Sequence, residues 1–246
     1  MKYIILRTAG FLATALTIAG GWLTAVTTQA SAQAMFKDEG TLAPAEETYD
    51  IDIEDGDVLA IILTSEDFDT VLTLLGPDGE EVAFNDDFGG SLNSRIIYSA
   101  TAAGSYTVIT KSFDGQGGDY SLEVRPATAY EVSQNEAQTL LQTGDYDGAI
   151  MAYSEAIELD SENPEAYLGR ADAYFAKAQS ILESEGRVLE GPDDLPPDIQ
   201  AAIVSDFQTA AELYDAAEDP ATAQSLREQI QFIETGEIPG PAGGVR

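Results

Sequence analysis

Residues 144–160 read GDYDGAIMAYSEAIELD, and this stretch decides the fold of the second half of the chain. Its apolar side chains fall on one face of an α-helix, and they are Tyr146, Ala149, Ile150, Tyr153, Ala156 and Ile157. Alanine on that face lets a neighbouring helix approach closely, and Gly144 suits the break between two helices. The stretch therefore predicts the second helix of a helical hairpin.

The same pattern extends outward at the period of a known repeat. With Tyr130 as the first position, small and aromatic residues fill the expected helix and turn sites at Ala137, Gly144, Tyr146, Ala149, Tyr153 and Ala156. This resembles the tetratricopeptide repeat (TPR), a helical hairpin of about 34 residues. The resemblance implies one repeat at 130–163 and another at 164–217. The second is carried by Tyr167, Ala171, Tyr174, Ile203, Phe207 and Ala210.

Three further segments complete this half, for which we expect a helical domain over 128–235. An insertion near 183–196 separates the helices of the second repeat, and Pro197 suits the start of the next helix. A helix over 220–234, with an apolar stripe from Ala223 to Ile233, is expected to cap the array. Residues 236–246 are rich in Gly and Pro and are predicted to be disordered.

The first half has a period of two instead. Tyr49, Ile51 and Ile53 alternate with acidic residues, and residues 58–63 form a continuous apolar run that suits a strand covered on both faces. Further short runs follow at 71–75, 81–84, 95–98, 105–109 and 120–124, separated by Gly, Asp and Asn. Many short strands with such turns predict an antiparallel sandwich or barrel.

Five phrases of this half occur in an order typical of one family: DFDTVLTL at 67–74, NDD at 85–87, NSRI at 93–96, GSYTV at 104–108 and GDYSL at 118–122. Residues 38–126 resemble the bacterial pre-peptidase C-terminal (PPC) domain, a β-sandwich accessory of secreted proteases, which implies a domain over 35–127. The predicted fold is thus multidomain, β followed by α: an antiparallel PPC-like β-sandwich, then a short TPR array of α-helical hairpins with a capping helix.

The N-terminus carries the pattern of a secretory signal over 1–34. Lys2 and Arg7 precede an uncharged stretch from Ala9 to Val26, and Ala32-Gln33-Ala34 forms a small-x-small cleavage site. The uncharged stretch, about 18 residues long, is also borderline for a membrane span. Since glycines and threonines dilute it, we expect cleavage, no stable span afterwards, and an exported protein, periplasmic or secreted.

Composition excludes several chemistries. The 246 residues include no His and no Cys, which removes Ser-His-Asp and Cys-His catalysis, disulfides and thiolate metal sites. A formal charge of −33 opposes binding to nucleic acid or to an anionic membrane. The PPC resemblance therefore does not imply protease activity, and we expect no enzyme.

A carboxylate-based hydrolase is the alternative that these exclusions leave open. It would have to use Asp67 with Asp69, or Asp86 with Asp87, as acid and base. Adjacent loop acids are weak grounds for it, because the chain has forty-four carboxylates.

One cofactor hypothesis is calcium. Carboxylate and amide oxygens are the ligands that Ca²⁺ prefers, and two loops supply the tentative set Asp67, Asp69, Asn85, Asp86 and Asp87. The simpler interpretation is that these side chains cap turns. No EF-hand spacing is present, and we expect no other cofactor.

The TPR resemblance also implies a binding groove lined by first helices. Its positions carry over to Glu131, Gln134, Gln138, Leu141, Glu165, Leu168, Asp172 and Phe175. These acidic and apolar residues favour a basic or amphipathic protein or peptide. Leu141, Leu168 and Phe175 can equally well cover the core of the array itself.

We therefore expect a non-enzymatic interaction or scaffold protein, with the sandwich as an accessory binding module. The alternative is a sandwich that binds carbohydrate or matrix, either with or without Ca²⁺, with the helices as a spacer. Tyr98, Tyr106, Phe113 and Tyr120 offer rings for sugar stacking, although cross-strand packing also explains them.

Overall fold

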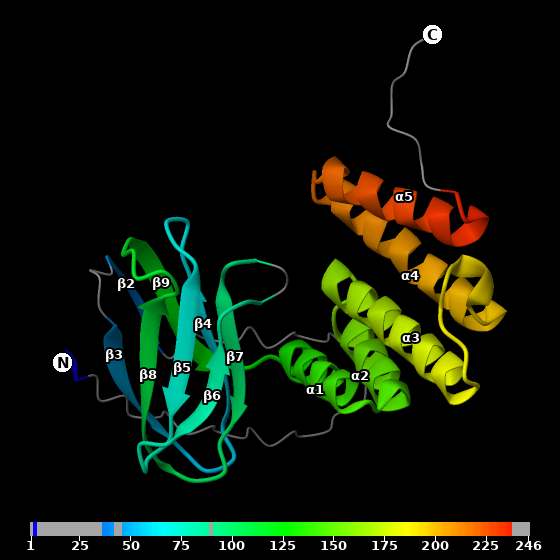
Figure 1. The fold of residues 1–246 in the computed structure, drawn as a ribbon. Helices are drawn as coiled ribbons and strands as arrows, with labels where there is room; N and C mark the ends of the chain where they lie inside the picture. The colour runs from blue at the N-terminus through cyan, green and yellow to red at the C-terminus, as the bar shows by residue number, and fades with distance from the viewer. Residues whose placement is uncertain (1, 4–35, 42–45, 89–90, 238–246) are drawn as a thin grey trace, which may run out of the picture. The chain divides into compact units, whose positions relative to one another are not determined.

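The computed structural model describes residues 2–3, 36–41, 46–88 and 91–237, and the chain divides into two compact units, residues 1–128 and 129–246 (Figure 1). The first unit is built from strands and the second from helices. Two antiparallel sheets followed by helical hairpins confirm the predicted fold class. Apart from Lys2–Tyr3, the expected signal over 1–34 lies outside the described residues, as do residues 238–246 of the expected disordered tail.

Two sheets make up the first unit. One has the strand order β1-β3-β8-β5-β6, and the other has the order β2-β9-β4-β7. Every pairing is antiparallel except that of β1 with β3. The strands are β1 (Lys2–Tyr3), β2 (Phe36–Thr41), β3 (Glu47–Ile53), β4 (Val58–Thr64), β5 (Thr70–Leu75), β6 (Glu81–Asn85), β7 (Ser94–Ser99), β8 (Gly104–Ser112) and β9 (Asp119–Pro126).

Alternation places the core between the sheets. Tyr49, Ile51 and Ile53 of β3 are buried, as their period of two predicts. The apolar run of β4 pairs with β7 on one side and β9 on the other, which accounts for its near-complete burial. β2 lies before the predicted strands and pairs with β9 along its whole length.

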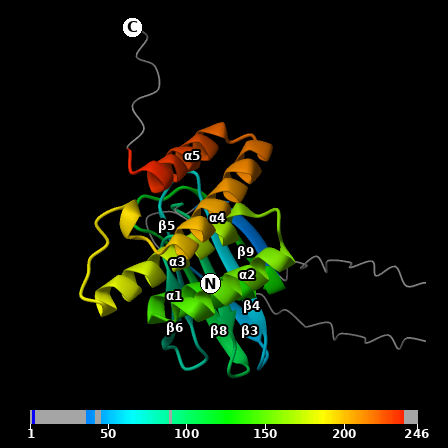
Figure 2. The same ribbon diagram turned by 90° about the vertical axis from the view of Figure 1, so that its right-hand side faces the viewer.

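Five α-helices and one short 3-10 helix make up the described part of the second unit, residues 129–237. They are α1 (Ala129–Thr143), α2 (Tyr146–Leu159), α3 (Pro164–Ser184), η1 (Pro192–Asp194), α4 (Pro197–Ala216) and α5 (Pro220–Thr235). In both views α4 lies between α3 and α5 (Figures 1 and 2). α2 packs against both α1 and α3, so successive helices stack along the unit.

Local sequence sets the helix ends. Pro occupies the first turn of α3, α4 and α5, where its missing N–H would be unbonded in any case. The side chains of Asp145, Asn163 and Asp219 accept hydrogen bonds from backbone N–H groups at the starts of α2, α3 and α5. Gly144 has a φ of 82°, which suits glycine at the turn between α1 and α2.

None of the helices formed by the described residues is long and apolar enough to cross a membrane.

Candidate functional site

The predicted groove residues on α3 share one side of that helix. Glu165, Leu168, Asp172 and Phe175 follow one another at helical spacing. Asp172 is exposed, whereas the other three are half-buried. Leu168 and Phe175 also pack against the core of the helical unit, so they partly serve the array itself, as the simpler interpretation expects.

The predicted residues on α1 are less accessible. Glu131 and Gln134 are buried, and Gln138 and Leu141 are half-buried. Leu141 packs against the alanine-rich core that also holds Ala137, Ala149 and Ala156. The one exposed residue of the predicted groove, Asp172, therefore lies on α3.

Two carboxylates of α3 gather near the hydroxyl of Tyr153. Burial, reinforced by the charges of Asp172 and Glu165, raises the pKa of Tyr153 to about 12. Glu165 also accepts a hydrogen bond of 3.2 Å from the hydroxyl of Tyr214 on α4. Of the two, Asp172 is thus the carboxylate that remains available to a partner.

Asp172 is exposed and nevertheless surrounded by protein. Desolvation by the surrounding atoms raises the pKa of its carboxyl, although the side chain is accessible. The charge of such a carboxylate acts in a medium of lower dielectric constant than bulk water.

The positive charges of the helical unit are already neutralised within it. Residues 129–237 contain twenty-four Asp and Glu but only four Lys and Arg. All four of these cations form ion pairs: Arg170 with Asp206, Lys177 with Asp147, Arg187 with Asp194, and Arg227 with Asp215. Most carboxylates of the unit therefore have no basic side chain beside them among the described residues.

One of these pairs ties three helices together. The guanidinium of Arg170 on α3 donates two hydrogen bonds to the carboxylate of Asp206 on α4, at 3.0 and 2.6 Å, and one to the hydroxyl of Ser154 on α2, at 2.9 Å. Asp206 is buried, and this hydrogen bonding raises the pKa of Arg170. The pair therefore has a structural role between the helices.

A cavity of about 240 Å³ opens between α3, the segment that follows it and α5, and we call it the α3–α5 cavity. Its lining is mostly apolar and consists of Phe175, Leu189, Glu190, Gly191, Pro192, Leu195, Gln229, Phe232 and Ile233. Leu195 and Ile233 are buried, Phe175 and Leu189 are half-buried, and Phe232 is 38 % exposed. Phe175 is thus the one predicted groove residue that also lines this cavity.

The insertion supplies one wall of the cavity, and the carboxylate of Asp194 bonds to two of its residues. Asp194 accepts hydrogen bonds of 3.1 Å from the guanidinium of Arg187 and from the backbone N–H of Glu190. These bonds lower the pKa of Asp194. The amide of Gln200 on α4 donates a 2.6 Å hydrogen bond to the carbonyl of the lining residue Ile233, which joins the end of α5 to α4.

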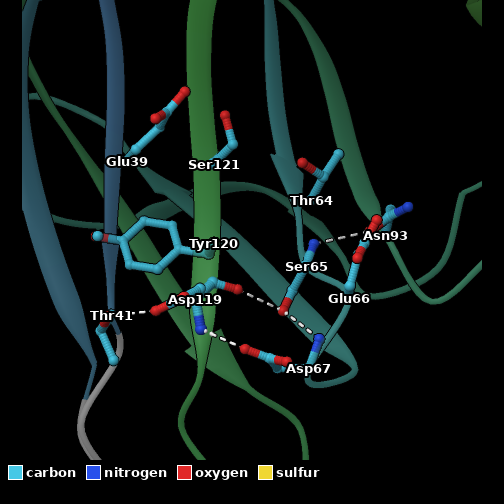
Figure 3. Close-up of a pocket in the computed structure, with 11 residues that line it drawn as sticks. Glu39, Thr41, Thr64, Ser65, Glu66, Asp67, Asn93, Asp119, Tyr120 and Ser121 are labelled. Atoms are coloured by element: carbon cyan, nitrogen blue, oxygen red, sulfur yellow. Dashed lines mark hydrogen bonds between the residues drawn. The ribbon is translucent and has the colours of Figure 1, made fainter.

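A second hollow lies on the sandwich, and we call it the sandwich groove (Figure 3). Its volume is about 680 Å³, and its lining is polar and acidic: Glu39, Gly40, Thr41, Thr64, Ser65, Glu66, Asp67, Asn93, Asp119, Tyr120 and Ser121. No basic residue lines it among the described positions.

Hydrogen bonds between two segments help to hold the sandwich groove in shape. The carboxylate of Asp67 accepts a 2.8 Å bond from the backbone N–H of Asp119, and the hydroxyl of Ser65 donates a 2.7 Å bond to the carbonyl of Asp119 (Figure 3). Gly118 permits this approach, because a Cβ there would lie 2.4 Å from the Cβ of Asp67.

The five residues of the calcium hypothesis have different interaction partners in the structure. Asp67 lies in the sandwich groove, bonded to Asp119. Asn85 bonds to the backbone of Arg95 and Asp87. Burial and the nearby charges of Asp87, Asp86 and Asp114 raise the pKa of Asp69. Within the described ranges, no group of three or more acidic side chains is placed to hold a metal ion.

Sequence reasoning missed most of the cavity. Leu189, Leu195 and Phe232 lie outside the groove positions that the repeat implies, because the insertion and the capping helix interrupt the repeat pattern. The available signal was the pair of leucines within an otherwise polar, Pro- and Gly-containing segment. Asp114, next to the acidic loop residues, was missed for a similar reason, since it follows a different strand.

Comparison with known proteins bears on each unit. Residues 137–177 match the family model of the TPR repeat. A TPR repeat-containing protein of Methanocaldococcus jannaschii is 38 % identical over 74 residues, which is 29 % of this chain. The chain spans only 13 % of that relative's length.

Solved structures similar to the chain include β domains from bacteria. One is the pre-peptidase C-terminal domain of a collagenase from Bacillus anthracis, 17 % identical, with a TM-score of 0.32 over 36 % of this chain and 87 % of that one. Another is PliG of Aeromonas hydrophila, a periplasmic inhibitor of g-type lysozyme, 14 % identical, with a TM-score of 0.32 over 37 % and 85 %. The family match concerns the other unit: the helices from α1 to α3 contain a TPR repeat over residues 137–177.

Proposed function

We propose that this chain is a non-enzymatic, exported interaction protein whose helical unit binds a basic or amphipathic segment of another protein. TPR repeats imply binding to a protein partner, and one such repeat is present here. The observation that carries the finer proposal is the charge of the helical unit, whose four cations are all paired and whose carboxylate at Asp172 is exposed. A cationic segment complements such a surface.

A charge-reversal pair of variants tests this proposal. Asp172→Lys places a cation at the exposed groove position on α3, and Glu155→Lys makes the same charge change at an exposed site on α2. Each variant of the full chain is immobilised, and captured proteins from envelope and secreted fractions are compared with those of the wild type. We expect a partner that the wild type and Glu155→Lys retain and Asp172→Lys loses.

The proposal fails if Asp172→Lys retains the same proteins as Glu155→Lys. Equal loss in both variants would point to total charge instead of a surface on α3. Thermal denaturation of each variant shows whether the fold is intact, so a loss of binding is not confused with unfolding.

Export is part of the proposal and has its own test. The charged start, uncharged stretch and Ala32-Gln33-Ala34 of the sequence support cleavage after Ala34. N-terminal sequencing of the protein made in a bacterial host should then begin at Met35. A product that retains Lys2 would contradict cleavage.

The sandwich groove favours a second candidate function, the binding of a carbohydrate or matrix polymer by the first unit. Hydroxyl, amide and carboxylate groups converge on a hollow large enough for a small ligand. A glycan array probed with the full chain tests it, with Ser121→Tyr as a variant that fills the groove from β9. Binding that Ser121→Tyr abolishes would support this function, and an array without signal would contradict it.

A further inference from the structure

The α3–α5 cavity is too small for a whole ligand and well suited to one side chain. Small-molecule sites usually measure about 300–1,000 Å³, whereas this cavity measures about 240 Å³. Its floor is formed by the buried Leu195 and Ile233, and its walls by Phe175, Leu189 and Phe232. A single large apolar side chain fits these dimensions and this lining.

The charge around the cavity indicates what kind of segment carries that side chain. Glu190 lines the cavity, and no Lys or Arg does so among the described residues. Arg187, in the same insertion, is paired with Glu185 and Asp194. Glu228 and Glu234 are exposed on α5 beside the lining residues Gln229 and Ile233. An apolar floor with an acidic rim complements a cationic segment with one apolar anchor.

We propose that the α3–α5 cavity is the anchor site for the partner of the helical unit: a basic protein segment inserts one large aliphatic or aromatic side chain between Phe175, Leu189 and Phe232. This inference rests on the proposed function and adds the position and chemistry of the contact. It also makes residues 185–196, the part of the predicted insertion that lies outside α3, the segment that sets specificity, because this segment forms one wall. The strongest contacts of protein interfaces are commonly aromatic anchors in such desolvated pockets.

Two short peptides serve as probes. Both are acetylated, amidated and fluorescently labelled, with the sequences Lys-Lys-Trp-Lys-Lys and Lys-Lys-Ala-Lys-Lys, so that they differ only in the anchor. Fluorescence anisotropy with the full chain at low ionic strength measures both affinities. Burial of the indole predicts that the Trp peptide binds at least about tenfold more tightly than the Ala peptide.

Three variants of the full chain locate the contact. Gly191→Leu adds bulk at the lining without a backbone penalty, because a Cβ at Gly191 has no atom within 4 Å and its φ is extended. Phe232→Ser removes a partly exposed wall residue and leaves the buried floor in place. Val188→Ser is the control, since Val188 belongs to the same insertion, is 72 % exposed and does not line the cavity. Gly191→Leu and Phe232→Ser should bring the Trp peptide to the affinity of the Ala peptide, while Val188→Ser should change nothing.

Each other outcome has a definite meaning. Equal affinity of the two peptides, with both weakened by Asp172→Lys, would overturn the anchor site and leave the proposed function standing. If neither peptide binds, both the anchor site and the proposed function are overturned. If removal of residues 238–246 raised the affinity of the Trp peptide alone by about tenfold, the chain's own terminus would compete for the cavity, and the proposed occupant would be wrong.

Discussion

At the scale of single residues, the ring of Tyr153 on α2 leaves no room for a side chain at Gly169 on α3. A Cβ at Gly169 would lie 2.3 Å from the ring, closer than atoms can approach. Alanine in a helix interior is otherwise favoured over glycine by about 1 kcal/mol, so the two effects have opposite signs. We expect the clash to prevail and Gly169→Ala to lower the free energy of unfolding by about 1–3 kcal/mol, as overpacking does, measured by urea denaturation.

A second substitution separates the clash from other causes. In the variant Tyr153→Ala the ring is absent, and adding Gly169→Ala to it should cost little or should stabilise. Stabilisation by Gly169→Ala in the wild-type background would show that α2 and α3 do not meet as closely as the structure has them.

Asp69 gives a prediction about pH. Burial and the charges of Asp87, Asp86 and Asp114 raise its pKa, so the folded state binds a proton more readily than the unfolded state. The charged carboxylate therefore destabilises the sandwich, and this effect sets in as the pH rises through the folded pKa. Asp69→Asn should raise the Tm at neutral pH, and the gain should vanish in acid, below the ordinary pKa of aspartate.

Asp52→Asn is a matched control, because Asp52 is an exposed carboxylate on β3 of the same sheet. An equal gain from both substitutions would show that only total charge matters. The same melts with added Ca²⁺ test the calcium hypothesis. A rise in Tm that Asp69→Asn abolishes would support a cation at this loop.

At the scale of secondary-structure elements, the pair of Arg170 and Asp206 is expected to hold α2, α3 and α4 in register. Removing one member of a buried pair leaves an unpaired charge and costs about 3 kcal/mol or more. Asp206→Leu should therefore destabilise the helical unit strongly. The double variant Arg170→Met with Asp206→Leu should recover much of the loss, because a well-packed apolar pair can replace a buried ion pair. A double-mutant cycle by urea denaturation gives the coupling, and additive losses would contradict it.

The elements also show what sequence alone can predict. Strand positions followed from alternation such as that of Tyr49 and Ile51, and helix starts from Pro164 and Pro197, because these signals are local. The contact of Gly169 with Tyr153 and the bond of Arg170 to Asp206 join residues that lie far apart in the sequence. Such pairs depend on how helices pack, which no short pattern encodes.

The candidate site likewise contains residues that the sequence predicts and residues that it does not. Phe175 was predicted from its place in the repeat, and it lines the α3–α5 cavity. Leu189 and Phe232 were not predicted, because an insertion and a capping helix have no fixed repeat position. The repeat therefore indicates which side of α3 is available, while the departures from the repeat shape the cavity.

At the scale of the whole molecule, the charge of −33 gives a prediction about salt. Salt weakens favourable ion pairs and also screens repulsion among like charges. Arg187 and Arg227 belong to solvent-exposed pairs, which contribute little to stability. Against them stands the large excess of acidic over basic residues in the chain. We expect repulsion to dominate, so that the Tm rises with ionic strength.

Scanning calorimetry of the full chain across a sodium chloride series measures this effect. The polyamine spermine should raise the Tm at a much lower concentration than sodium, since one multivalent cation neutralises several carboxylates at once. If the helical unit is where a cationic partner binds, spermine should also compete with the lysine-rich peptides at the same concentrations. If the Tm falls with salt, the ion pairs outweigh the repulsion. The acidic surface would then no longer account for the selection of a basic partner.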